Sequence, residues 1–192
     1  MNPPASSTRT LSTAEDRREA VLAAAMPIVA ERGLKGTSTA DVAKAAGISH
    51  AYLFRLFPTK NDLTVAVLKR VNQRIYGAFA AAAAKAKAAG DDPMMAMGQA
   101  YGELLADREL LLLQMHGHAA AAEDETIREV SRDGFARLVD LVERETGAEP
   151  LTVGRFFATG MLMNVMAALD AAGTQEHWAQ VLTGYCLEAD QD

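Results

Sequence analysis

The chain has 192 residues, of which 49% are hydrophobic and 23% are charged, and it contains a single cysteine. This composition excludes a disordered chain, a collagen-like repeat and a disulfide-stabilised scaffold. The longest uncharged run, residues 156–169, is shorter than the roughly 20 residues that cross a bilayer. Residues 1–20 lack the apolar core of a signal peptide. We therefore expect a cytoplasmic protein that does not enter a membrane.

Lysine and arginine are concentrated towards the N-terminal end of the chain. Residues 1–75 carry a net charge of +5 and residues 76–192 carry −11, which together give the −6 of the whole chain. A basic head on an acidic body is typical of a nucleic-acid-binding domain joined to a part with another role. Solvated surface charges can produce the same asymmetry by chance. The motifs described below are therefore needed to distinguish the two interpretations.

Helix signals follow one another along the chain, and the period-two pattern of strands is absent. Residues 1–12 are predicted to form a flexible polar arm. Glycine and proline stops and Ser, Thr or Asp caps then divide the rest into helices, near 14–32, 38–46, 50–57, 59–89, 93–107, 108–121, 124–146, 150–172 and 175–188. We expect an all-α fold of about nine helices, with a three-helix DNA-binding head over 13–60 and a six-helix ligand-binding and dimerisation body over 61–192.

The second and third helices are short and are separated by Gly47, which suits a helix-turn-helix that reads DNA. The turn needs a residue that tolerates a positive φ, and glycine does so without strain. Val42 and Leu53 are expected to pack the two helices together. The N-terminal turn of the second helix in such a motif meets base edges in the major groove, and here it reads Ser49, His50, Ala51 and Tyr52.

Three motifs occur with unbroken spacing between Glu19 and Leu63: an "AxxxxxERG" helix end, then "DVAKAAGIS", then "LFRLFPTKNDL". The last parallels "LYxHFxSKExL", and together the motifs resemble the DNA-binding domain of the TetR/AcrR family of transcriptional regulators. The resemblance implies an all-helical body that senses a small molecule and holds a homodimer. Phe54 and Leu56 stand where the family commonly has tyrosine and histidine on phosphates, so fewer phosphate contacts are expected here.

The candidate DNA contacts have separate expected roles. Ser38 offers a hydroxyl and free backbone N–H groups to a phosphate, and Arg55 and Lys60 add positive charge. His50 and Tyr52 are the candidates for base-edge contacts, beside an alanine that can meet a thymine methyl. The full candidate set is Ser38, Thr39, Ala40, Ser49, His50, Ala51, Tyr52, Phe54, Arg55 and Lys60.

Seven of the nine methionines lie in the body, where their flexible side chains can re-pack around apolar ligands. For any single one of them, ordinary core packing is the more common explanation. Polar residues on otherwise apolar helix faces suggest a pocket with a few orienting hydrogen bonds, although a core histidine satisfied by a neighbour is the alternative. The candidate effector-binding residues are Met97, Tyr101, Gln114, Met115, His118, Phe135 and Met163. No metal or other cofactor is expected, because His116 and His118 project to nearly opposite sides of a helix.

Residues 156–169 are uncharged on every side, and such a helix has to be buried on every side. One side is expected to face the pocket and the other a second copy of the chain, with the last helix completing a four-helix bundle. The candidate interface residues are Phe156, Phe157, Met161, Leu162, Val165, Trp178, Leu182 and Tyr185.

The sequence thus favours a homodimeric repressor that leaves a near-palindromic operator in double-stranded DNA when a small hydrophobic or aromatic effector binds. Two alternatives stay open. One is an architectural DNA binder that senses nothing. The other is an all-helical enzyme, which the scattered acidic residues do not favour.

Overall fold

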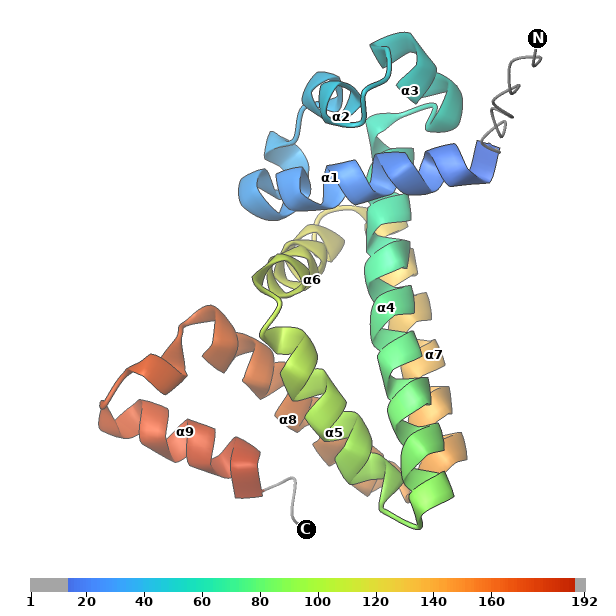
Figure 1. The fold of residues 1–192 in the computed structure, drawn as a ribbon. Helices are drawn as coiled ribbons and strands as arrows, with labels where there is room; N and C mark the ends of the chain where they lie inside the picture. Colours follow the sequence, from blue (N-terminus) through green and yellow to red (C-terminus); the bar gives the residue numbers. More distant parts are fainter. Residues whose placement is uncertain (1–13, 189–192) are drawn as a thin grey trace, which may run out of the picture.

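The computed structural model describes residues 14–188, so the predicted arm over 1–12 lies outside the described residues. Within 14–188 the regular structure is entirely helical, as Figure 1 shows, and the expected all-α fold is confirmed. The elements are α1 (Ala14–Gly36), α2 (Thr39–Ala45), α3 (His50–Leu56), α4 (Lys60–Ala89), α5 (Pro93–Leu105), α6 (Arg108–Ala121), α7 (Glu125–Thr146), α8 (Pro150–Ala168), the 3₁₀ turn η1 (Ala171–Gly173) and α9 (His177–Glu188).

The short helices of the head begin at side-chain caps. Ser38, Ser49 and Thr59 each accept a hydrogen bond from the backbone N–H three residues later, which starts α2, α3 and α4. Thr59 also forms a capping box with Asp62, whose carboxylate accepts from the Thr59 backbone. Gly47 adopts the positive φ of 66° that the turn between α2 and α3 requires. These local interactions are the ones the sequence predicted.

Two helix ends differ from the prediction. Gly33 was expected to end the first helix, and it does leave helical geometry (φ 72°, ψ 168°), but one further turn follows it to Gly36. The eighth helix was expected to reach residue 172 and ends at Ala168. Asp170 has a φ of 51°, which breaks the helix before the 3₁₀ turn η1. A polar side chain that tolerates left-handed backbone here replaces the glycine that usually signals such an end.

Head and body share one continuous apolar core. Leu53 of α3 and Phe57, which directly follows this helix, are fully buried in the core of the head, where α3 packs on α1 and α2. The core then continues along α4 from Leu63 to Phe79, between α5, α6 and α7. Figure 1 shows α4 as the long axis, with α1, α2 and α3 gathered at its N-terminal end. Helix α4 therefore belongs mechanically to both parts, and a change in the body can reach the head through it.

The remaining helices close the body around α4. Helix α5 turns back along α4, α6 lies against α1, and α7 packs along α4 (Figure 1). Helix α8 packs on α5, α6 and α7, and α9 packs on α8 and η1. Within the described part of the chain, α8 is the one helix long and apolar enough to cross a membrane. Length and composition alone are weak evidence for a span, and α8 here forms one wall of the cavity described below.

Candidate DNA-binding face and effector cavity

Helix α3 separates its outward side chains cleanly from its core side chains. Leu53 and Leu56 are buried with Phe57, which directly follows the helix. The outward face carries five exposed side chains, those of Ser49, His50, Ala51, Phe54 and Arg55. Ala40 is also exposed, and the remaining DNA candidates Ser38, Thr39, Tyr52 and Lys60 are half-buried. Leu56, which stands where the resemblance implies a phosphate-binding histidine, instead fills the head core, so Phe54 is the apolar side chain that this face presents.

His50 is held in place before any DNA arrives. Its Nε2 lies 2.8 Å from the Thr39 hydroxyl, which joins the first turns of α2 and α3. The edge of its ring meets Phe54, with ring centroids 4.8 Å apart. Two contacts on different sides of the imidazole restrict its rotamer, so Thr39 and Phe54 act as supports for His50 as well as surface residues.

Two arginines of α1 join this surface, and sequence reasoning did not select them. Arg17 and Arg55 place their guanidinium groups 5.8 Å and 5.9 Å from the centre of the Tyr52 ring. Arg18 lies 4.4 Å over Phe57 and donates to the Leu56 carbonyl at the end of α3. Cation–π contacts of this kind orient a guanidinium without neutralising it. The sequence feature that could have identified them is that they are adjacent arginines near the start of the basic head.

Lys60 makes a contact within the protein that the sequence did not predict. Its Nζ donates to the Lys35 carbonyl at 2.7 Å and so ties the start of α4 to the end of α1. The ammonium group has three donors, so this contact leaves two of them available for a phosphate.

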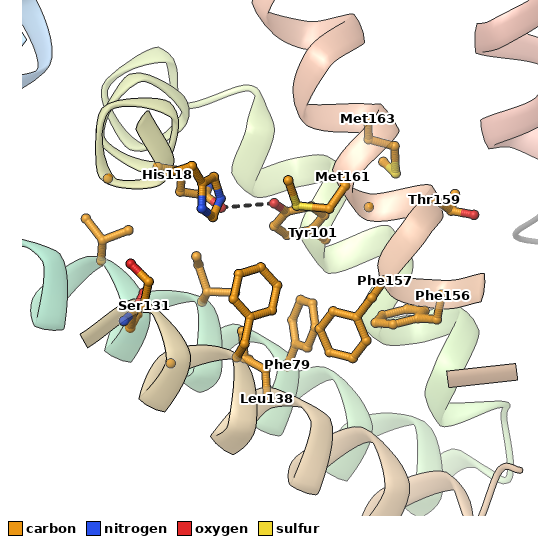
Figure 2. A pocket seen from close by; sticks show the side chains of 18 of the residues that line it. Phe79, Tyr101, His118, Ser131, Leu138, Phe156, Phe157, Thr159, Met161 and Met163 are labelled. Carbon is orange, nitrogen blue, oxygen red and sulfur yellow. Dashed lines mark hydrogen bonds between the residues drawn. The ribbon is translucent and has the colours of Figure 1, made fainter. Parts of the chain in front are cut away.

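The body contains a cavity of about 80 Å³ enclosed by α4, α5, α6, α7 and α8. Six rings line it and form a continuous series of contacts with centroid separations of 5.5–6.2 Å. In order of contact, they are Tyr101, Phe79, Phe156, Phe157, Phe135 and His118. Figure 2 labels five of these rings, all except Phe135, and shows them reaching the cavity from different helices, together with Met161 and Met163 of α8. Phe135 and Met161 are also partly exposed, at 37% each, and so mark a route from solvent.

Asn164, Tyr101 and Gln114 form a buried chain of hydrogen bonds at the Tyr101 end of this aromatic series, called the polar relay below. The Asn164 side-chain amide donates to the Tyr101 hydroxyl at 2.6 Å, and that hydroxyl donates to Gln114 Oε1 at 2.9 Å. Burial raises the pKa of Tyr101 even though its two hydrogen bonds act in the opposite direction. Burial also lowers the pKa of His118, so its imidazole is neutral at neutral pH.

The structure separates the candidate effector residues into two groups. Tyr101, Gln114, His118, Phe135 and Met163 line the cavity. Met97 and Met115 do not. Met97 is fully buried in the core and Met115 is packed against it. The sequence reasoning placed all seven together because each lies on an apolar helix face, but helix rotation turns these two methionines away from the cavity. Phe79 and Asn164 were missed, since a phenylalanine in an apolar stripe and a lone asparagine carry no distinguishing signal.

The candidate interface residues also divide. Phe156, Phe157 and Met161 line the cavity, and of these three Met161 is also exposed to solvent. Leu162 and Leu182 pack between α8 and α9. Val165, Trp178 and Tyr185 are exposed. Leu151, Leu169 and Val181 extend this exposed apolar surface and were not selected.

Helix α6 connects the cavity with the head. It presents Gln114 and His118 to the cavity, and between them His116 lies with Nε2 3.2 Å from the Ala30 carbonyl of α1. Lys35 of α1 also pairs with Glu123, just beyond α6. A displacement of α6 by a ligand therefore acts directly on α1.

The N-terminal part of the chain matches a family model described as bacterial regulatory proteins of the tetR family, over residues 21–67. The HTH-type transcriptional repressor Rv3405c of Mycobacterium tuberculosis is 37% identical over 73 residues, which is 38% of this chain and 39% of that protein. The chain thus matches about two fifths of the length of this curated relative.

Solved structures extend the likeness across the body. A TetR-family member from Streptomyces coelicolor, SCO1917, superposes with a TM-score of 0.71 at 25% identity, over 88% of this chain and 96% of that one. The transcriptional regulator FadR from Bacillus subtilis, solved with stearoyl-CoA, gives a TM-score of 0.68 at 15% identity over 90% of this chain and 96% of its own. The helix-turn-helix, the nine-helix order over residues 14–188 and these likenesses agree: residues 21–67 form a DNA-binding domain of the tetR family of bacterial regulatory proteins, and the described helices share the fold of TetR-family members.

Proposed function

We propose that the protein is a homodimeric, sequence-specific transcriptional repressor that leaves a near-palindromic operator when a small apolar or aromatic effector enters the cavity. The observation that carries this proposal is the position of α6. One helix lines the cavity through Gln114 and His118 and touches α1 of the head through His116. The protein would act in the cytoplasm, where bacterial DNA is accessible.

The outward face of α3 is the DNA-reading surface in this proposal. His50, held by Thr39, and Tyr52 would contact base edges in the major groove. Arg55 and Arg17, oriented on the Tyr52 ring, would contact phosphates on either side. Ser38 and Ser49 cap their own helices through their hydroxyl oxygens, which accept, so each hydroxyl proton stays available for donation to a phosphate.

The exposed apolar side chains of α8 and α9 support a dimer. Large apolar side chains exposed on two helices that pack together are typical of a protein interface, and here they include Val165, Trp178, Val181 and Tyr185. A two-fold axis between two copies of this hairpin would make the contact self-complementary. Two heads would then read half-sites about one helical turn apart, or a multiple of it.

For the effector to release the operator, it needs only a modestly higher affinity for the head arrangement that does not fit DNA. A hundredfold change in DNA affinity corresponds to about 2.7 kcal/mol of coupling between the sites. Insertion of a ligand between the rings of α6, α7 and α8 would shift α6, and the contacts of His116 and Lys35 would pass that shift to α1. The relatives agree with this outline, since Rv3405c is named a repressor and FadR was solved with a bound ligand.

Selection from random duplex DNA with the purified protein tests the DNA-binding part. We expect enrichment of an inverted repeat, bound by a dimer, with an affinity that falls steeply as salt rises. His50→Ala should relax the preference at one position of each half-site. Arg55→Ala should weaken binding to all sequences and lower the magnitude of the salt slope by about one for each phosphate that the arginine had neutralised.

Arg132→Ala, on the exposed surface of α7, is the matched control for the removal of one arginine and should leave DNA binding unchanged. A monomer in solution, or a failure to prefer any sequence over random DNA, would contradict the proposal. An operator complex that no apolar or aromatic compound disrupts would instead indicate an architectural DNA binder.

A further inference from the structure

The cavity lining carries no formally charged side chain among the described residues that form it. Its polar members are amides, hydroxyls and the imidazole of His118, which burial keeps neutral. An ionised ligand group placed here would lose its hydration without meeting an opposite charge, and that cost is large in an apolar enclosure. The lining therefore selects for an uncharged ligand.

The contact of Asn164 with the Gly160 carbonyl determines which group donates and which accepts in each hydrogen bond of the polar relay. Asn164 Nδ2 lies 3.2 Å from the Gly160 carbonyl, which can only accept, so the nitrogen of this amide has to face it. The same nitrogen lies 2.6 Å from the Tyr101 oxygen, so the tyrosine accepts from Asn164. The single hydroxyl proton of Tyr101 is then free to be donated to Gln114, whose Oε1 accepts at 2.9 Å.

The relay leaves the amide nitrogen of Gln114 without a hydrogen-bond partner. Gln114 is only 8% exposed, and its Nε2 is one of the few buried polar atoms of the described chain that lack a partner. Asn164 Oδ1 lacks one too, but Asn164 does not line the cavity, whereas Gln114 does. An unmade hydrogen bond of a buried donor destabilises the unliganded state, so a ligand that supplies an acceptor there gains affinity.

We propose that the effector is an uncharged aromatic carbonyl compound, whose ring packs among the phenylalanines and whose oxygen accepts a hydrogen bond from Gln114 Nε2. This inference rests on the proposed function in one respect, namely that the cavity is the effector site. It adds the charge of the ligand, the functional group that it carries and the residue that recognises this group.

The size of the cavity agrees with a compact ligand. A cavity of roughly 150 Å³ holds a benzene molecule, and the enclosed space here is about 80 Å³. A single-ring ligand therefore enters only if side chains that line the cavity move aside. The flexible methionines Met161 and Met163 line the cavity, and Met161 is partly exposed. A ligand that displaces lining side chains also disturbs the helices that carry them.

Three ligands of nearly equal shape test the inference by calorimetry on the full chain without DNA. Acetophenone carries the carbonyl, α-methylstyrene replaces its oxygen by a CH₂ group, and benzoate carries a charge. We expect acetophenone to bind at least tenfold more tightly than α-methylstyrene, equivalent to about 1.4 kcal/mol. Benzoate should bind at least a hundredfold more weakly than acetophenone.

The variant Gln114→Met keeps the side-chain length and removes the amide. In it, the preference for acetophenone over α-methylstyrene should fall to about one, while α-methylstyrene binds at least as well as before. Gln99→Met makes the same chemical change on the exposed surface of α5 and should retain the wild-type preference. If Gln114→Met does not fold, the ligand series on the wild-type protein still decides.

Equal binding of the ketone and the alkene to the wild-type protein would overturn the inference, as would tight binding of benzoate or binding of none of the three. Operator release is measured separately. Acetophenone that binds with the expected preference but leaves the operator complex intact would support the ligand assignment and contradict the proposed release.

Discussion

The DNA-reading face and the aromatic cavity are assembled over very different distances along the chain. Most of the face is formed by residues from Ser38 to Lys60, which caps and turns a few residues away hold in place, and α1 adds Arg17. The rings of the cavity extend from Phe79 to Phe157 and come from five helices. Local chemistry alone can form the first, whereas the second exists only when the whole body has packed. The head should therefore tolerate changes in the body better than the cavity does.

The largest difference in the free energy of unfolding is expected between the alanine variants of two phenylalanines, one in the head and one at the cavity. Phe57 is fully buried in the head core, while Phe135 is 37% exposed at the cavity. Phe57→Ala should lower the free energy of unfolding by about 3–5 kcal/mol, because it leaves a cavity that a short-helix head cannot close. Phe135→Ala should cost less than half as much, because part of its surface is already in water. Urea unfolding of both variants measures this difference, and equal losses would show that Phe135 is a core residue.

A smaller effect is expected where α7 approaches α4. A Cβ atom built on Gly134 would lie 2.4 Å from Asn72 Nδ2, the group that donates to the Val130 carbonyl at 3.3 Å. Gly134→Ala should force this side chain away and reduce stability by about 1–3 kcal/mol. Gly77→Ala on α4 is the control, because a Cβ there meets no atom within 4 Å. It should stabilise the protein by about 0.5–1 kcal/mol. Thermal unfolding of the two variants tests whether the close contact between Gly134 and Asn72 stabilises the protein. An unchanged melting temperature for Gly134→Ala would show that it does not.

The smallest effect is a dependence of stability on pH that comes from the cavity alone. Burial lowers the pKa of His118 below its ordinary value of 6.5. As the pH falls through 6.5, the unfolded chain takes up a proton at His118 before the folded chain does, so unfolding becomes more favourable. The loss continues until the pH passes the folded pKa and then stops growing. At neutral pH and above, the group has no such effect.

His118→Leu should remove this component while every other titrating group is retained. Comparing the free energy of unfolding at pH 7.5 and 5.5 in the two proteins isolates it, and the decline should be steeper in the wild type. Parallel declines would show that His118 is solvated in the folded protein.

The helices and the head follow from the sequence alone, because their signals are local. Serine and threonine caps, a glycine turn and regularly spaced apolar positions act within a few residues, so Gly47, Ser49 and the buried Leu53 are where the pattern placed them. The family resemblance has the same origin, since its motifs lie in this local segment.

Which apolar side chains face the cavity depends on tertiary packing. The rotation and tilt of each helix turned Met97 and Met115 away from it and turned Phe156 and Phe157 into it. Packing also paired Tyr101 with Asn164, 63 residues away, and left the Gln114 amide unpaired. An apolar residue at helical spacing satisfies the hydrophobic effect against any neighbour, so sequence spacing records that it is buried but not what it is buried against.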